Sequence, residues 1–251
     1  MRTLFKGGTV ITGRGPKRAD VLVEGEKVRQ VGRLILTPAD RTVDVEGCLL
    51  FPGFIDAHTH FDLDVCNTTT ADDFTTGSRA ALKGGTTTVI DFACPNKGES
   101  LQYGLDLWHK KADGRTFCDY GFHMTIDDWN ETIEREIDDM YAEGISSFKM
   151  YMTYPAMMIG DEAMYKALKK LKEKNPRLII GVCGCMAQQK HIVDKLRASY
   201  PYVDLVFGVD GIDRLPAMLV ERLHRGKRYL ETPVERNAVV EELPIRRDSG
   251  F

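Results

Sequence analysis

The sequence predicts an α/β fold built on a parallel sheet and preceded by a small β structure. The first fifty residues carry β-branched side chains between glycines and charged turns, with no helical period. After that point, short β-branched runs alternate with amphipathic stretches that have helical spacing. Such alternation is typical of consecutive βαβ units, whose strands lie parallel in one sheet.

Each early element has a local signal. Short strands are expected in the segments TLFKGGTVITG, ADVLVEG and KVRQVG. Pro52 and Gly53 then break the pattern, and residues 54–57 (FIDA) are expected to form a short buried strand. A helix is expected from Thr70, a plausible N-cap, to the glycine at position 84.

The later elements continue the alternation. Further strands are expected at residues 86–92, 119–124, 146–152, 177–183 and 202–208. Helices are expected at residues 99–112, 130–144, 161–175, 186–200 and 212–226. From residue 227 the chain is charged and shows no pattern, so a tail or linker is expected there.

Composition and charge exclude several classes of protein. The chain has 251 residues, of which 43% are hydrophobic and 28% charged, as in ordinary globular proteins. A net charge of −3 shows no strongly basic field for nucleic acid. No apolar run is long enough for a membrane span, and the N-terminus lacks the apolar core of a signal peptide. The six cysteines are too sparse for a disulfide scaffold, so we expect a cytoplasmic protein with no membrane partner.

Two histidines follow the expected strand at residues 54–57. His58 and His60 lie two residues apart, so on extended chain their side chains point the same way. They could therefore present two imidazoles to one metal ion. The carboxyl end of a strand is also where the chemistry of an α/β barrel lies. The alternative is a pair of ordinary polar loop histidines, because a bare H-x-H is common.

Longer motifs extend this signal. The segment PGFIDAHTHFDLD, followed in order by TADDF, GGTTTVIDF, DYGFHM and SSFKMYMTYPAMM, resembles the dihydropyrimidinase/D-hydantoinase branch of the metal-dependent amidohydrolases. The resemblance covers the chain up to about residue 170. It implies a TIM barrel with a small β-sandwich, and an enzyme with two metal ions, usually zinc, that opens a small cyclic amide or ureide.

The same resemblance implies roles for four residues. His58 and His60 match ligands of one metal, and Lys149 matches a lysine that CO2 carboxylates so that it bridges both metals. Tyr154 matches a tyrosine that contacts substrate. From the residues alone, Lys149 reads as a strand-end lysine that reaches solvent, and Tyr154 as a packing aromatic.

The resemblance to hydantoinases ends after KALKKLKE. The family continues with two further histidine ligands and an aspartate that binds metal and handles the proton. Where the next histidine is expected, this chain reads GVCGCM, with Cys183 nearest, and a cysteine is a chemically competent zinc ligand. We therefore expect a partial barrel, an incomplete sandwich, and impaired hydrolysis.

The second half of the chain resembles another family. KKLKEKNPRLIIGVCGCMAQQ, followed by YPYVDLVFGVDGIDRLPAML, resembles the N-terminal domain of the tRNA methylthiotransferases, which are radical S-adenosylmethionine enzymes. This resemblance implies that Cys185 is one of three cysteines that hold a 4Fe-4S cluster, with tRNA as partner. From the residues alone, Cys183 and Cys185 are two strand-end thiols.

Together the two resemblances predict a chimeric, truncated chain of two loosely joined lobes. The expected domains are a partial β-sandwich, the first half of an amidohydrolase barrel, a partial methylthiotransferase α/β domain and a tail, at residues 1–52, 53–170, 171–226 and 227–251. The alternatives to a cyclic-amide hydrolase are a methylthiotransferase fragment and a non-catalytic remnant. Exposed half-barrel edges would favour homo-oligomers.

Overall fold

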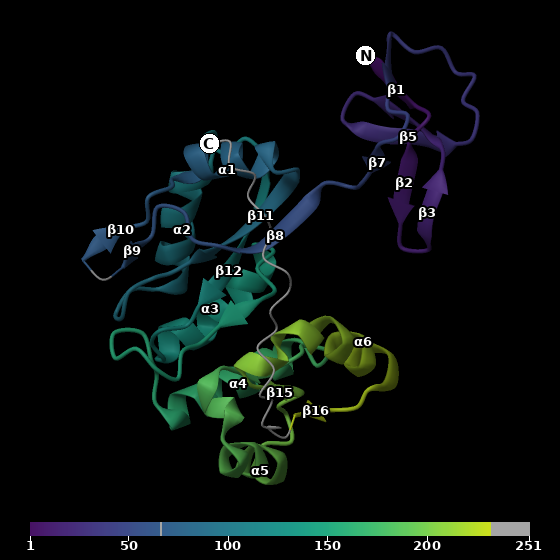
Figure 1. Ribbon diagram of the computed structural model, residues 1–251. Coiled ribbons are helices and arrows are strands. Elements are labelled where there is room, and N and C mark those ends of the chain that lie inside the picture. Colours follow the sequence, from purple (N-terminus) through teal and green to yellow (C-terminus); the bar gives the residue numbers. More distant parts are fainter. Residues whose placement is uncertain (66, 232–251) are drawn as a thin grey trace, which may run out of the picture. The chain divides into compact units, whose positions relative to one another are not determined.

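The computed structural model describes residues 1–65 and 67–231 (Figure 1). The chain divides into two compact units, Met1–Met164 and Tyr165–Phe251. Both this division and the expected junction near residue 170 lie within helix α4 (Asp161–Lys174). Most of the expected tail, 227–251, lies outside the described residues. None of the described helices is both long and apolar enough to cross a membrane.

The N-terminal segment forms two small sheets. One has the strand order β5-β4-β1-β6, with β1 antiparallel to β4 and parallel to β6. The other has the order β3-β2-β7. Leu4, Leu22 and Ile35 form the buried cluster of this region. The strands are β1 (Arg2–Lys6), β2 (Thr9–Thr12), β3 (Gly15–Arg18), β4 (Asp20–Glu24), β5 (Lys27–Gly32), β6 (Arg41–Asp44) and β7 (Leu49–Leu50).

The rest of the first unit is a four-stranded parallel sheet with helical connections, as the alternating pattern predicts. Its strand order is β13-β12-β11-β8, and each neighbouring pair is parallel. Figure 1 shows β8, β11 and β12 side by side. The strands are β8 (Phe54–Thr59), β11 (Thr86–Ala93), β12 (Asp119–Thr125) and β13 (Phe148–Lys149). The connecting elements are the hairpin β9 (Asp64–Val65) and β10 (Thr68–Thr69), and the helices α1 (Phe74–Lys83), α2 (Leu101–Ala112) and α3 (Glu131–Ala142).

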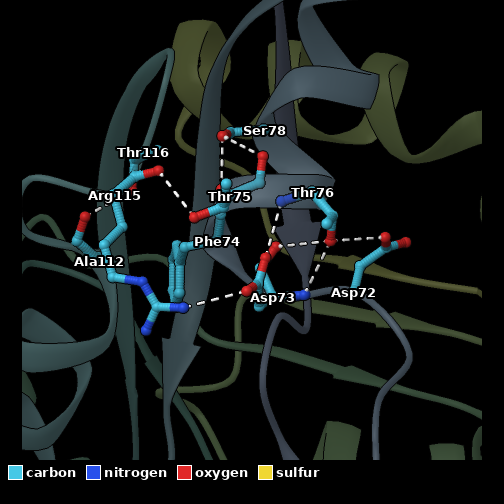
Figure 2. Close-up of polar contacts among 9 residues, drawn as sticks. All are labelled: Asp72, Asp73, Phe74, Thr75, Thr76, Ser78, Ala112, Arg115 and Thr116. Carbon is cyan, nitrogen blue, oxygen red and sulfur yellow. Dashed lines mark hydrogen bonds and ion pairs between the residues drawn. The ribbon is translucent and has the colours of Figure 1, made fainter.

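The N-cap of helix α1 is Asp73 rather than the expected Thr70. The Asp73 carboxylate accepts from the Thr76 amide at 2.7 Å, and the Thr76 hydroxyl accepts from the Asp73 amide at 3.1 Å (Figure 2). This reciprocal capping box satisfies two backbone donors at once. Arg115 reinforces it with an ion pair to Asp73 at 3.0 Å. The Thr70 amide instead donates to the Leu63 carbonyl, so Thr70 belongs to the preceding hairpin.

The second unit contains a three-stranded parallel sheet of order β14-β15-β16. Its strands are shorter than expected, and β16 lies where the pattern predicted only a tail. That expectation was wrong for β16, because two residues are too few to show an alternating pattern. The elements are β14 (Gly181–Cys183), η1 (Cys185–Gln188), α5 (Lys190–Ser199), β15 (Leu205–Phe207), η2 (Val209–Arg214), α6 (Leu215–Arg225) and β16 (Tyr229–Leu230).

A buried carboxylate joins the elements of the second unit. Asp204 is 3% exposed and accepts from the Ile180 amide at 2.9 Å, from Lys172 Nζ at 3.1 Å and from Arg222 Nε at 2.8 Å. The two cations come from α4 and α6, so one side chain ties both helices to the sheet. Removing one partner of such a buried ionic group leaves the other charges uncompensated.

Replacing Asp204 should therefore destabilise the second unit selectively. We expect Asp204→Asn to cost about 3 kcal/mol, because Lys172 and Arg222 lose their counter-ion. The exposed pair of Asp194 and Arg197 provides the control, and Asp194→Asn should cost below about 1 kcal/mol. Hydrogen exchange of peptides from residues 178–207 in the full chain measures both effects. Equal losses in the two variants would contradict this assignment.

Close packing in the first unit can be tested at a helical glycine. A Cβ at Gly77 on α1 would lie 2.2 Å from the Phe61 ring, which packs edge-on against Phe74 at 5.5 Å. Gly77→Ala should lower the free energy of unfolding by about 1–2 kcal/mol, since overpacking outweighs the gain in helix propensity. A Cβ at Gly121 meets no atom within 4 Å, so Gly121→Ala is the control. Urea unfolding followed by circular dichroism compares them, and equal midpoints would refute the clash.

Candidate metal centre

The carboxyl ends of the parallel strands collect polar side chains on one face of the sheet. Residues alternate between the two faces, so His58 and His60 at the end of β8 share one face. The register pairs Phe92 on β11 with His123 on β12, and neighbouring residues in register share a face. Lys149 ends β13 at the far side of the same sheet.

The two predicted histidine ligands converge. His58 Nε2 and His60 Nε2 lie 3.2 Å apart, and the ring centroids are 5.0 Å apart. Two nitrogens that bind one tetrahedral zinc ion are about 3.3 Å apart, given the usual Zn–N distance. The pair therefore fits one metal ion. The Nδ1 atom of His60 is buried and has no hydrogen-bond partner among the described residues, so hydrogen bonding at that atom does not fix the ring.

The Phe92 ring lies at the centre of the candidate site. Its centroid is 4.7 Å from that of His58, 5.0 Å from that of His60 and 4.7 Å from that of His123. Lys149 Nζ lies 4.6 Å from the same centroid. The structure thus brings the three predicted metal-site residues, His58, His60 and Lys149, around one buried ring. Their role as ligands stays a prediction.

The electrostatics of this cluster favour neutral imidazoles. Burial lowers the pKa of His58, and the Lys149 ammonium lowers it further. Burial also lowers the pKa of His60, with the Asp91 carboxylate acting in the opposite direction. Neutral imidazole is the form that binds metal ions, so both shifts keep the pair ready for a cation.

His123 contributes structure rather than a free nitrogen. Its Nε2 lies 2.9 Å from the Ala57 carbonyl and donates to it, and its Nδ1 accepts from the Ser147 hydroxyl. Both ring nitrogens are therefore engaged, and the side chain ties β12 to the end of β8. The sequence assigned no ligand role to this residue.

Tyr154 lies in the loop that follows β13. Its side chain is exposed, and its backbone adopts the left-handed conformation with φ of 65°, which is uncommon for an aromatic residue. The ring lies 6.1 Å from Tyr151, whose own ring centroid is 4.9 Å from Lys149 Nζ. The predicted substrate residue is thus linked to the cluster through Tyr151. Its contact with substrate stays a prediction.

The cysteines of the second unit form no closed site. Cys183 and Cys185 are exposed on either side of Gly184, which has φ of 119°. Within residues 1–65 and 67–231, no three or more His, Cys, Asp or Glu side chains are arranged to hold a metal ion. An iron–sulfur cluster needs several thiolates, so the expected role of Cys185 gains no support.

Comparison with known proteins identifies the family. The chain matches the Amidohydrolase family over residues 49–203, which is more than half of its length. It belongs to this family. The match continues past residue 170, where the sequence predicted the hydantoinase-like part to end. Nothing in the comparisons supports a methylthiotransferase domain, an iron–sulfur cluster or a chimera.

The relatives of this amidohydrolase include enzymes named for cyclic amides. It is 40% identical over 185 residues to the D-hydantoinase of Streptomyces coelicolor, covering 71% of this chain and 39% of that protein. It is 40% identical over 179 residues to the dihydropyrimidinase of Rattus norvegicus, covering 68% and 34%. The chain thus spans less than half the length of these relatives.

Solved structures agree with the sequence relatives. The crystal structure of dihydropyrimidinase from Brevibacillus agri has a TM-score of 0.69 and 38% identity, covering 78% of this chain and 42% of that one. A dihydroorotase structure with 13% identity and a TM-score of 0.55 shares the fold alone. The mixed α/β architecture of this amidohydrolase is therefore confirmed.

Two buried carboxylates near the cluster were missed by sequence reasoning. Asp91 lies within the apolar run TTTVIDF and is fully buried, and burial raises its pKa. Asp127 follows β12 and is 5% exposed, with one carboxylate oxygen that has no partner among the described residues. A charged residue in or just after an expected strand was the available signal. Cys94 is close to both, and burial raises its pKa to about 12, which keeps it a thiol.

Asp127 should make stability depend on pH. Burial raises the pKa of Asp127 from 3.8 to about 6. A hydrogen bond with Thr125 and the ammonium groups of Lys97 and Lys149 act in the opposite direction. The folded state therefore holds the proton more tightly than the unfolded state. Ionised Asp127 destabilises the fold above pH 6, and this cost disappears as the pH falls from about 6 to about 4.

Asp127→Asn removes the ionisation and tests this sign. At pH 8 the variant should be more stable than the wild type by about 2–3 kcal/mol. The difference should vanish near pH 4, where Asp127 is protonated in both states. Urea unfolding at a series of pH values measures the difference. A difference that stays constant across that range would contradict the assignment.

Proposed function

We propose that this amidohydrolase opens a small cyclic amide or ureide of the dihydropyrimidine or hydantoin class, with zinc at the carboxyl edge of the parallel sheet. The observation that carries the proposal is the convergence of His58, His60 and Lys149 around Phe92. Similarity to D-hydantoinases and dihydropyrimidinases supports the substrate class.

Each residue of the cluster has a distinct role in the proposal. His58 and His60 would hold the metal through their Nε2 atoms, which already converge. Lys149 would become an anionic oxygen ligand when its amine adds to CO2, which forms an N–C bond and releases a proton. Zinc, when bound, polarises the amide carbonyl and lowers the pKa of water.

The side chain of Tyr154 is exposed, and its hydroxyl is suited to hydrogen-bond a ring amide. It lies in the loop after β13, next to Tyr151. A phenol both donates and accepts, so it can pair with either the carbonyl or the N–H of a cyclic amide. A hydrogen bond from or to Tyr154 would orient the substrate ring relative to the histidine pair.

Hydrolysis by the described residues alone is proposed to be slow. His58, His60 and Lys149 supply only part of a two-ion ligand set, and no larger group of His, Cys, Asp or Glu ligands occurs within residues 1–65 and 67–231. The proposal assigns no described residue as general acid or base, and the loss of such a group typically lowers the rate by a factor of about 10²–10⁴. Metal binding is therefore a more direct readout than turnover.

The test measures metal content before activity. The full chain is loaded with zinc in bicarbonate buffer, its zinc content is measured, and hydrolysis of dihydrouracil and hydantoin is followed. We expect zinc to bind to the wild type and to be lost in the double variant His58→Ala, His60→Ala. His191→Ala removes an exposed histidine of the second unit and should bind zinc like the wild type.

Two further results bear on the proposal. Native mass spectrometry should show one added CO2 on the wild type and none on Lys149→Ala. A wild type that binds no zinc would contradict the proposed metal centre. Iron with acid-labile sulfide in place of zinc would instead favour the methylthiotransferase alternative and the predicted role of Cys185.

A further inference from the structure

We infer that Asp91 is a positioning residue that holds the His58–His60 pair on the metal-binding face of the sheet. The inference deepens the proposed function and rests on it, because the pair matters chemically only as a metal site. Asp91 itself faces away from the histidines. It acts through the backbone and side chain of the segment that carries them.

Both oxygens of the Asp91 carboxylate are saturated with donors. Oδ2 accepts from Thr59 Oγ1 at 2.8 Å and from the Phe61 amide at 2.8 Å. Oδ1 accepts from Trp108 Nε1 at 2.9 Å and from the Phe92 amide at 2.8 Å. Asp91 is 0% exposed, so water does not compete for these bonds.

The two Oδ2 bonds hold the residues on either side of His60, and the first of them lies between the two histidines. Thr59 lies between His58 and His60, and Phe61 follows His60 directly. Side chains alternate along an extended chain, so holding Thr59 toward Asp91 turns both histidines to the opposite face. A rotation of this segment would carry both imidazoles away from Phe92 together.

Backbone pairing of β8 with β11 does not by itself fix the orientation of the histidine segment. The register of β8 against β11 is irregular between Val89 and Asp91, just where Asp91 meets Thr59. His60 Nδ1 has no partner among the described residues, so that atom does not orient the ring. The Asp91 carboxylate therefore supplies orientation that the strand ladder does not.

The two halves of the carboxylate should have separable effects. The Oδ2 bond from Thr59 acts on the histidine segment, whereas the Oδ1 bond from Trp108 anchors Asp91 to α2. The two bonds are alike in length. Losing either should affect stability, but only the loss on the Thr59 side should disturb the histidine pair.

The experiment compares Thr59→Val with Trp108→Phe in the full chain. Zinc affinity is measured by competition with a chromogenic chelator, and Co2+ absorption reports the ligand geometry. We expect Thr59→Val to weaken zinc binding about tenfold and to alter the Co2+ spectrum. Mutation of a residue that orients metal ligands typically has an effect of this size. Trp108→Phe should stay within about twofold of the wild type. Thr59→Ser keeps the hydroxyl and should restore wild-type affinity.

A second measurement needs no metal. In the metal-free protein, Thr59→Val should shift the ring-proton NMR signals of His58 and His60, and Trp108→Phe should leave them nearly unchanged. If the wild type binds no zinc, the proposed function fails, but these signals still decide the inference. The inference is overturned if Thr59→Val leaves the signals and affinity unchanged, or if Trp108→Phe changes them equally.

Discussion

Parallel pairing of β8, β11 and β12 is the constraint from which the candidate site follows. The pairing aligns the carboxyl ends of strands that are far apart in sequence, and it matches Phe92 with His123. The Phe92 ring then serves as a common surface for two imidazoles and one ammonium group. A shift of one residue in this register would turn these side chains to the helical layer.

The site brings together groups that repel one another. The Lys149 ammonium disfavours protonated His58, and burial disfavours protonated His58 and His60, so both pKa values fall. A cation replaces protons at such a pair more easily than at an ordinary one. Carboxylation would reverse the sign of the charge on Lys149, which turns a repulsive neighbour into a ligand. In the proposed metal centre, the repulsion between these groups would therefore be replaced by attraction to the bound cation.

Each unit contains a buried carboxylate that stabilises that unit, and the two carboxylates act in different ways. Asp204 compensates Lys172 and Arg222, so its role in the second unit is ionic. Asp91 accepts only from neutral donors, and its role is to fix direction rather than charge. Directional bonds of this kind restrict rotation of the segment that carries His58 and His60, while the charge of Asp91 also acts to raise the pKa of His60.

The sequence by itself determined the alternation of strands and helices and the shared face of His58 and His60, because both depend on local periodicity. It also carried the family motifs, which depend on the order of residues along the chain. Only the tertiary structure decided the central position of Phe92 and the hydrogen bonds from Thr59 and Phe61 to Asp91. Both depend on which strands become neighbours, and hydrogen bonds across such distances leave no period in the chain. Asp73 rather than Thr70 is the N-cap of helix α1 for a related reason. The Thr70 amide is hydrogen-bonded to the Leu63 carbonyl in the preceding hairpin, a contact that forms only in the folded protein.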